Sequence, residues 1–273
     1  MLLIAFAAMA SADLERIYDP ATPDAEAFEI VRTAVESSDL AVVAALGRVH
    51  MFENARALGA ESWLMSHLDA GSVPMRDYGQ VPGLKEFLID HWRESHAASG
   101  FNADYDANTN EPWKGVPGLL SRFYPGDPDV HALIWQIVDT DATPAVSLRM
   151  MALQWLNVGR FTTHEADAYR MNVLVSETHP TRAYVNVGIA ARGLALARRP
   201  EALDSMIDAW QAHPLAGNEI AVAVASYPTS QLSLHAEQLR GFVDKADWRE
   251  LGSEAVKQAM TRIEAALPVI DEH

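Results

Sequence analysis

The segment PTRAYVNVGIAARGLAL, residues 180–196, places a proline before a stretch that is apolar on almost every side of a helix. The segment PAVSLRMMALQWLNV, residues 144–158, has the same design. A helix that is apolar all round has to be covered on more than one side. We therefore expect both segments to lie between neighbouring helices in the interior of the protein.

Three prolines mark a repeat around these two segments. Pro144, Pro180 and Pro214 are about 36 and 34 residues apart, and a helical pattern follows each of them. A second helical pattern lies between successive prolines, so each interval contains a helical hairpin. Periods of this length are typical of solenoids, in which each hairpin buries its apolar face against the next. The sequence predicts an all-α fold, an α-α superhelix or solenoid of stacked antiparallel helical hairpins.

The C-terminal helix has the clearest amphipathic pattern. Val256, Met260, Ile263 and Leu267 step by four, three and four residues, and Pro268 stops the helix. Residues 220–227, IAVAVASY, alternate as a strand would. No second candidate strand could pair with them, and an unpaired strand leaves its backbone groups unsatisfied. We therefore predict a buried helix there.

Composition limits the function classes. Of the 273 residues, 49% are hydrophobic and 21% are charged, which is usual for a folded globular protein. The net charge of −16 argues against nucleic acids and anionic membranes as partners. The chain has no cysteine, so disulfides, thiol nucleophiles and cysteine-ligated metals are excluded. No apolar run reaches the roughly 18 to 20 residues of a spanning helix, and we expect no transmembrane span.

The N-terminal end resembles an export signal. Residues 1–12 form an apolar run that ends in Ala10-Ser11-Ala12, although no basic residue precedes it. We expect a periplasmic or secreted protein; the alternative is a cytoplasmic protein whose first helix is buried. The expected organisation is a signal peptide or first helix at 1–12, a helical subdomain at 13–98, a polar loop insertion at 99–118 and a helical-repeat region at 119–273.

The repeat region resembles known helical-repeat families. Ala202, Met206, Ala209 and Pro214 have the spacing of the second helix of a tetratricopeptide repeat. Residues 156–166 resemble its inter-helix turn, with two extra residues, whereas Asn186, Ala190 and Gly193 replace the Trp, Gly and Tyr of its first helix. The looser HEAT-like class fits equally well. Both resemblances imply a solenoid.

A second resemblance covers the tail. Residues 239–243, LRGFV, followed by residues 256–264, VKQAMTRIE, are similar to the end of the helical C-terminal domain of zinc aminopeptidases. The His-Glu-x-x-His zinc motif of those enzymes does not occur in this chain. This resemblance implies a helical, non-catalytic domain.

One loop has the oxygen ligands of a calcium site. Carboxylates and amides at alternate positions can wrap a hard cation, which takes six to eight oxygens. Thr109 stands where an EF-hand loop requires Gly, and Gly115 stands where it requires Glu. The alternative is a polar loop whose side chains cap their own turns. The candidate ligands are Asp104, Asp106, Asn108, Asn110 and Glu111.

Three further residues are candidate binding residues. Trp113 lies in the polar loop, where an exposed Trp would contact a ligand or partner, or would pin the loop down. His179 and His213 each precede a proline at the repeat spacing, so both would line one edge of a solenoid. Their alternative role is structural, since helix C-termini favour cations.

We expect a non-catalytic scaffold that binds a protein or peptide in a helical-repeat groove. The first alternative is an all-α hydrolase with a carboxylate and histidine site near residues 91–111, and the second is a structural subunit of a larger assembly. No catalytic residue is assigned. His91 and His96 are five residues apart, so one helix face does not present both to zinc. No cofactor other than calcium is expected.

Overall fold

The fold is entirely helical in the residues that the structure, a computed structural model, describes. These are residues 16, 17, 19–37, 42, 43, 46, 76–99, 116–139, 146–178, 183–244, 248, 249 and 252–268, with the backbone alone described at 96–99, 137, 139 and 146–151. No strand occurs among them, as the all-α prediction requires. The chain divides into two compact units, Met1–Ala145 and Val146–His273.

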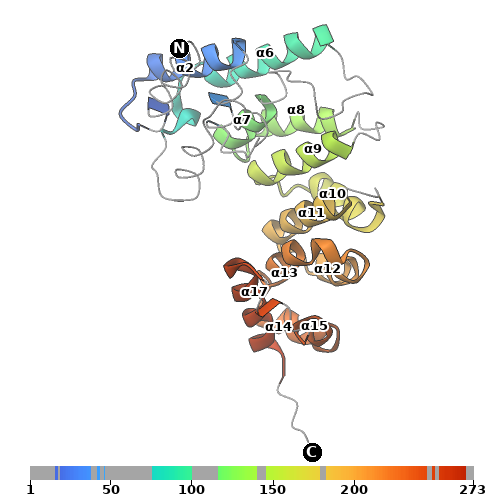
Figure 1. The fold of residues 1–273 in the computed structure, drawn as a ribbon. Coiled ribbons are helices and arrows are strands. Elements are labelled where there is room, and N and C mark those ends of the chain that lie inside the picture. Colours follow the sequence, from blue (N-terminus) through green and yellow to red (C-terminus); the bar gives the residue numbers. More distant parts are fainter. Residues whose placement is uncertain are drawn as a thin grey trace, which may run out of the picture. The chain divides into compact units, whose positions relative to one another are not determined.

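Aromatic side chains join the elements of the first unit, whose helices Figure 1 shows. The ring of Tyr78 stacks on that of Phe123 with centroids 4.9 Å apart, and its hydroxyl donates to the carbonyl of Ile17 at 3.0 Å. Phe28 meets Phe87 at 5.5 Å. These contacts join segments that are distant in sequence. The described elements are α2 (Asp24–Glu36), η1 (Tyr78–Gln80), α6 (Leu84–Ser99), α7 (Val116–Phe123) and α8 (Pro128–Asp139).

Asp127 caps the start of α8 and also ties that helix to α6. Its Oδ1 accepts from the backbone N–H groups of Asp129 at 2.9 Å and Val130 at 3.2 Å, and its Oδ2 accepts from Lys85 Nζ at 3.0 Å. Burial alone favours the neutral acid, but the hydrogen bonds from Lys85 and from the backbone lower the pKa of Asp127 below its ordinary value of 3.8. Because the pKa is lower in the folded state, the ionised Asp127 stabilises the fold at pH values above its ordinary pKa. This contribution is lost as the pH falls through the pKa of the folded state.

We expect Asp127→Ala to lower the free energy of unfolding of the first unit by about 1 kcal/mol near neutral pH. The difference between wild type and variant should narrow at pH 3, where protonation weakens the same contacts in the wild type. Urea unfolding at the two pH values measures both effects. Asp129→Ala is the control, because the Asp129 side chain is 72% exposed and should contribute less than about 0.5 kcal/mol. An equal loss at both pH values would contradict the role given to Asp127.

The second unit contains a row of four helices that contact one another in the order in which they occur along the chain. α9 contacts α11, α11 contacts α13, and α13 contacts α17, while α10 and α12 contact each other and the helices of that first row (Figure 1). The elements are α9 (Val146–Val158), α10 (His164–Ser176), α11 (Ala183–Ala197), α12 (Pro200–Ala212), η3 (Pro214–Ala216), α13 (Gly217–Val224), α14 (Thr229–Leu232), η4 (Ser233–His235), α15 (Ala236–Val243) and α17 (Glu254–Ala266).

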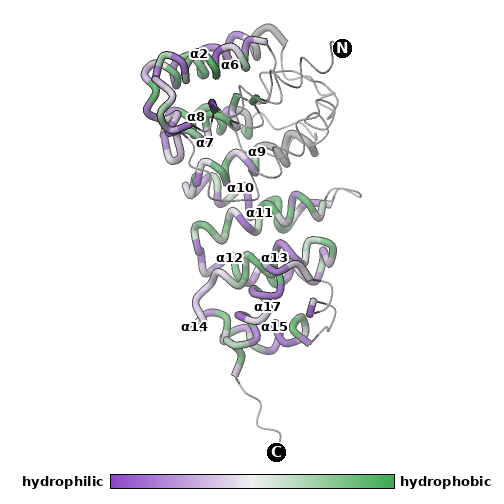
Figure 2. The backbone as a smooth tube through the Cα atoms, turned by 60° about the vertical axis from the view of Figure 1, so that its left-hand side comes forward, coloured by the Kyte–Doolittle hydropathy of each residue, from purple (hydrophilic) through white to green (hydrophobic). Residues whose placement is uncertain are grey.

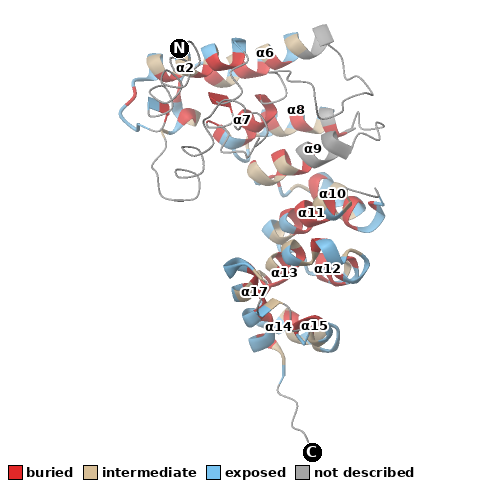
Figure 3. Cartoon of the chain, viewed as in Figure 1, coloured by how far each residue is buried: buried red, intermediate tan, exposed pale blue. Residues whose placement is uncertain are grey.

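The two apolar helices predicted to be buried contribute to the core of this second unit, α11 with several of its side chains and α9 with Leu153. α11 is green along most of its length in Figure 2, and its middle is buried in Figure 3. Residues 220–224 belong to α13 and are mostly buried, as predicted, whereas residues 225–227 follow the end of that helix. α17 ends at Ala266, and Val256, Met260 and Ile263 are buried on one face. Trp210 stacks on Phe242 with centroids 4.2 Å apart, which joins α12 to α15.

Candidate functional site

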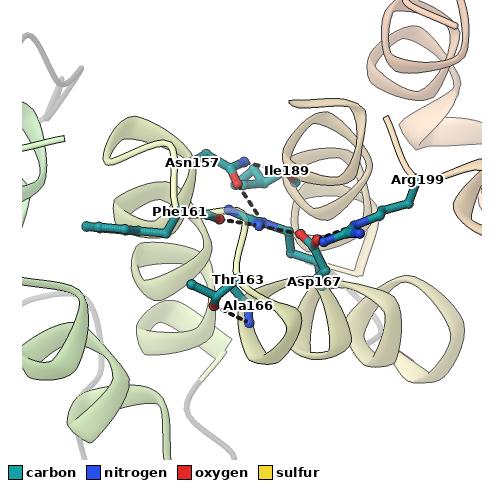
Figure 4. A network of polar contacts seen from close by, with 8 residues as sticks. Asn157, Phe161, Thr163, Ala166, Asp167, Ile189 and Arg199 are labelled. Atoms are coloured by element: carbon teal, nitrogen blue, oxygen red, sulfur yellow. Dashed lines mark hydrogen bonds and ion pairs between the residues drawn. The ribbon is translucent and has the colours of Figure 1, made fainter. Parts of the chain in front are cut away.

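A buried network of charged and polar groups joins four helices of the second unit (Figure 4). Arg170, on α10, is fully buried. Its Nε donates to Asn157 Oδ1 at 3.0 Å, and its Nη1 donates to the Phe161 carbonyl at 2.7 Å and to Asp167 Oδ1 at 2.9 Å. The second oxygen of Asp167 accepts from Arg199 Nε at 3.0 Å. The network therefore connects the α9–α10 hairpin to the start of α12.

The network also reaches α11 and the residues that follow α13. Asn157 Nδ2 donates to the Ile189 carbonyl at 2.8 Å, so the α9 side chain bonds to the backbone of α11. The hydroxyl of Tyr227 donates to the Arg199 carbonyl at 3.0 Å. Burial, followed by the charges of Glu201 and Asp167, raises the pKa of Tyr227 to about 12, so the hydroxyl keeps its proton and remains a donor at neutral pH.

The turn between α9 and α10 places the Phe161 carbonyl where Arg170 can reach it. Arg160 has a φ of 52°, the left-handed conformation that ends many helices. The N–H of Arg160 donates to the Asn157 carbonyl at 3.0 Å, and the N–H of Phe161 donates to the Leu156 carbonyl at 3.0 Å. This pair of bonds is the Schellman motif. Phe161 and Leu156 are both buried, which completes the apolar contact of the motif.

Electrostatics make this network a structural junction. Burial lowers the pKa of the Arg170 guanidinium, while the charge of Asp167 and its hydrogen bond raise it. Because arginine starts from so high a pKa, the group stays charged at neutral pH. A buried cation of this kind needs its carboxylate partner, and removal of one member leaves an uncompensated charge. The network therefore holds α9, α10, α11 and the start of α12 together.

A second feature of this unit is a group of exposed apolar side chains at the ends of successive helices. All the large hydrophobic side chains that are exposed among the described residues lie in the second unit. Val175, in the last turn of α10, is 70% exposed; Tyr184, in the first turn of α11, is 42% exposed; and Leu215, in η3, is 81% exposed. His213 lies next to Leu215 as the C-cap of α12 and is half-buried. We call Val175, Tyr184, His213 and Leu215 the junction edge.

The register between α11 and α13 brings members of the junction edge together. A Cβ added to Gly188 of α11 would lie 2.8 Å from the Cβ of Glu219 of α13, so these residues are in contact. Tyr184 lies one turn before Gly188, and Leu215 lies four residues before Glu219. The two helices run in the same direction because α12 returns between them, and η3 contacts α11. Tyr184 and Leu215 therefore lie at the same end of adjacent helices.

The structure describes some of the site residues predicted from the sequence. Of the candidate binding residues, His213 lies at the junction edge. His91 is half-buried on α6, where its ring lies 5.8 Å from that of Phe87 and its Nε2 is 3.4 Å from the hydroxyl of Ser95. His96 belongs to the same helix, and its side chain is not described. The candidates outside the described residues are the segment 1–12, the calcium loop Asp104, Asp106, Asn108, Asn110 and Glu111, and the binding residues Trp113 and His179.

The sequence analysis did not identify the buried network. At the start of α10, Thr163 is the N-cap, and its Oγ1 accepts from the N–H of Ala166 at 3.3 Å. Asp167 lies in the first turn of α10, where an acidic residue ordinarily serves the helix dipole. The available signal was the spacing of Asp167 and Arg170, three residues apart, together with Gly193 inside a long apolar helix. Asn186 is fully buried, and its Nδ2 donates to Glu177 Oε2 at 2.9 Å.

Comparison with known proteins gave no match: no protein-family model, no curated protein and no solved structure matches this chain. Within the described residues, no group of three or more His, Asp or Glu side chains could hold a metal ion. In that same part of the chain, no helix is both long enough and apolar enough to cross a membrane.

Proposed function

We propose that residues 146–268 are a helical-repeat solenoid that acts as a non-catalytic scaffold for a protein or peptide partner. The helix order supports this arrangement, because α9, α11, α13 and α17 contact one another in succession and the returning helices contact the same row. A stack of this kind offers an extended surface to a partner without a catalytic pocket. The spacing of the prolines and the resemblance to tetratricopeptide repeats support the same reading.

The observation that carries the proposal is the exposure of the junction edge. Leu215 is 81% exposed, although Ala216, the next residue of the same short helix η3, is buried. Single exposed hydrophobic residues are common on protein surfaces. Tyr184 and Leu215 differ from scattered residues because they meet at one end of two adjacent helices. Tyrosine is also enriched in the residues that contribute most to binding at protein interfaces.

The buried network orders the helices that carry the junction edge, so the edge is fixed before a partner binds. Tyr184 belongs to α11, whose backbone accepts the hydrogen bond from Asn157. Leu215 follows α12, whose start is held by the Arg199–Asp167 ion pair. A surface that is already ordered loses less conformational entropy on binding. The partner class that fits is a peptide segment with apolar side chains that cover Tyr184 and Leu215.

A displayed-peptide selection on the full-length protein tests this proposal. We expect enriched peptides with apolar side chains, and we expect the double variant Tyr184→Ser/Leu215→Ser to bind them at least about tenfold more weakly. Calorimetric titration of the best peptide measures the loss. Both side chains are exposed, so the melting temperature should stay close to that of the wild type.

Leu196→Ser/Leu234→Ser is the matched control. These residues are 50% and 81% exposed in the same unit and are not part of the junction edge. The control should keep its affinity within about twofold. A selection that enriches no peptide, or an equal loss in both double variants, would overturn the proposed function.

A further inference from the structure

A cleft lies between α6 and α8 of the first unit. Its volume is about 330 Å³, and both helices contribute residues at matching positions. α6 supplies Glu86, Ile89 and Arg93, and α8 supplies Asp129, Leu133 and Gln136, so each wall advances by about one helical turn at a time. The hydrogen bond from Lys85 to Asp129, at 3.0 Å, brings the N-terminal ends of the helices together. The cleft therefore follows two helices that run side by side (Figure 1).

The chemistry of the walls is uneven along the cleft. Its centre is apolar, because Ile89 and Leu133 are buried side chains that line it. The basic groups in the cleft have carboxylate partners: Lys85 bonds to Asp127 and Asp129, and Arg93 lies 3.7 Å from Asp90.

Glu86 differs from these groups. Its carboxylate is exposed, and within the described part of the chain no hydrogen bond or ion pair engages it. The cleft thus combines an apolar floor with an unpaired anion at its N-terminal end.

Most of the net negative charge of the chain lies in its first 145 residues, which include the helices that line this cleft. Residues 1–145 contain 22 acidic and 9 basic residues, a net charge of −13, whereas residues 146–273 contain 15 and 12, a net charge of −3. A field of this sign raises the local concentration of cations and disfavours anions. A cationic ligand suits both the negative field and the Glu86 carboxylate. Because the floor of the cleft is apolar, the ligand should also carry an aliphatic chain.

We propose that the α6–α8 cleft binds a primary alkylammonium group, with the ammonium at Glu86 and its aliphatic chain against Ile89 and Leu133. The aliphatic chain of the ligand covers the apolar floor of the cleft in the same way that the methylene groups of a lysine side chain cover apolar surface while the charged end stays in a polar environment. A lysine side chain of a polypeptide and a free diamine carry the same group. This site lies in the first unit and does not depend on the function proposed for residues 146–268.

Calorimetric titration of the full-length protein with 1,5-diaminopentane tests the site. We expect saturable binding with one ligand per chain that weakens as salt is added. Glu86→Gln should weaken it at least about fivefold, because the ammonium loses its counter-charge. Ala132→Phe should also abolish binding, because Ala132 is an exposed residue of the cleft wall and a ring there fills the space.

Glu94→Gln is the matched control, since Glu94 is an exposed carboxylate of the same helix that does not line the cleft. It should change the affinity less than about twofold. A second experiment compares a lysine-containing peptide with its norleucine counterpart. If the lysine peptide alone binds, with the same dependence on Glu86, the natural ligand is a lysine side chain of a polypeptide. If the free diamine alone binds, the natural ligand is a small molecule. No saturable binding of either probe, or equal weakening by Glu86→Gln and Glu94→Gln, would overturn the proposal.

Discussion

Asp167→Asn should lower the free energy of unfolding of residues 146–268 by about 3 kcal/mol, the largest effect expected of a single uncharging substitution in this chain. The Asp167 carboxylate accepts from Arg170 and from Arg199, at 2.9 and 3.0 Å. Arg170 is fully buried, so without this carboxylate its charge has neither water nor a counter-ion. Hydrogen exchange followed by mass spectrometry measures the loss and assigns it to peptides of the second unit.

Two further variants separate the buried charge from other causes. Asp208→Asn, on the exposed face of α12, should change the stability by less than about 0.5 kcal/mol. Asp167→Leu combined with Arg170→Met should be about 2 kcal/mol more stable than Asp167→Leu alone, because the double variant leaves no buried cation behind. If the two single-site Asp167 variants and the double variant were equally stable, the charge would not be the reason.

Gly193→Ala should destabilise the same unit by about 2 kcal/mol or more. A Cβ at position 193 would lie 2.1 Å from Asn157 Oδ1 and 2.3 Å from Arg170 Nε. Neither atom can retreat cheaply, since Asn157 bonds to the α11 backbone and Arg170 is held by three acceptors. The methyl group therefore breaks the network or pushes α11 away from α9. Denaturant unfolding followed by circular dichroism measures the effect.

Gly241→Ala is the matched control for this prediction. Gly241 also lies within a helix, but a Cβ there would meet nothing within 4 Å. Alanine is the better helix former by up to about 1 kcal/mol, so this variant should be as stable as the wild type or more stable. A similar loss in both glycine variants would show that backbone flexibility, and not the close approach to Arg170, explains the effect at position 193.

Local patterns predicted the helices well because each depends on short-range spacing. The step of Val256, Met260 and Ile263 defined the buried face of α17, and Pro268 follows its last turn. The helix over residues 220–224 followed from the lack of a partner strand. Helix capping has the same short range, since it joins residues three positions apart, as Thr163 and Ala166 are. None of these predictions needed to know where another helix lies.

The candidate sites were harder to predict because they join distant residues. The Arg170 network brings together Asn157, Asp167 and Arg199, and their pairing depends on how α9, α10 and the start of α12 pack in space. The cleft needs α6 and α8 to lie side by side, and the sequence shows only two separate amphipathic patterns. The role of Asp167 could not be predicted from its charge, since an acidic residue in the first turn of a helix usually interacts with the helix dipole and not with a buried arginine.

The sequence by itself determined that this chain is helical and where several of its helices begin and end, since propensity, capping and periodicity act over a few residues. Only the tertiary structure decided that Arg170 is buried, that Gly193 must remain a glycine, and that Tyr184 and Leu215 share one end of adjacent helices. The physical reason is range: burial, close approach and ion pairing depend on which surfaces meet in space, and residues 32 positions apart, such as Asp167 and Arg199, carry no mark in the sequence of the contact they make.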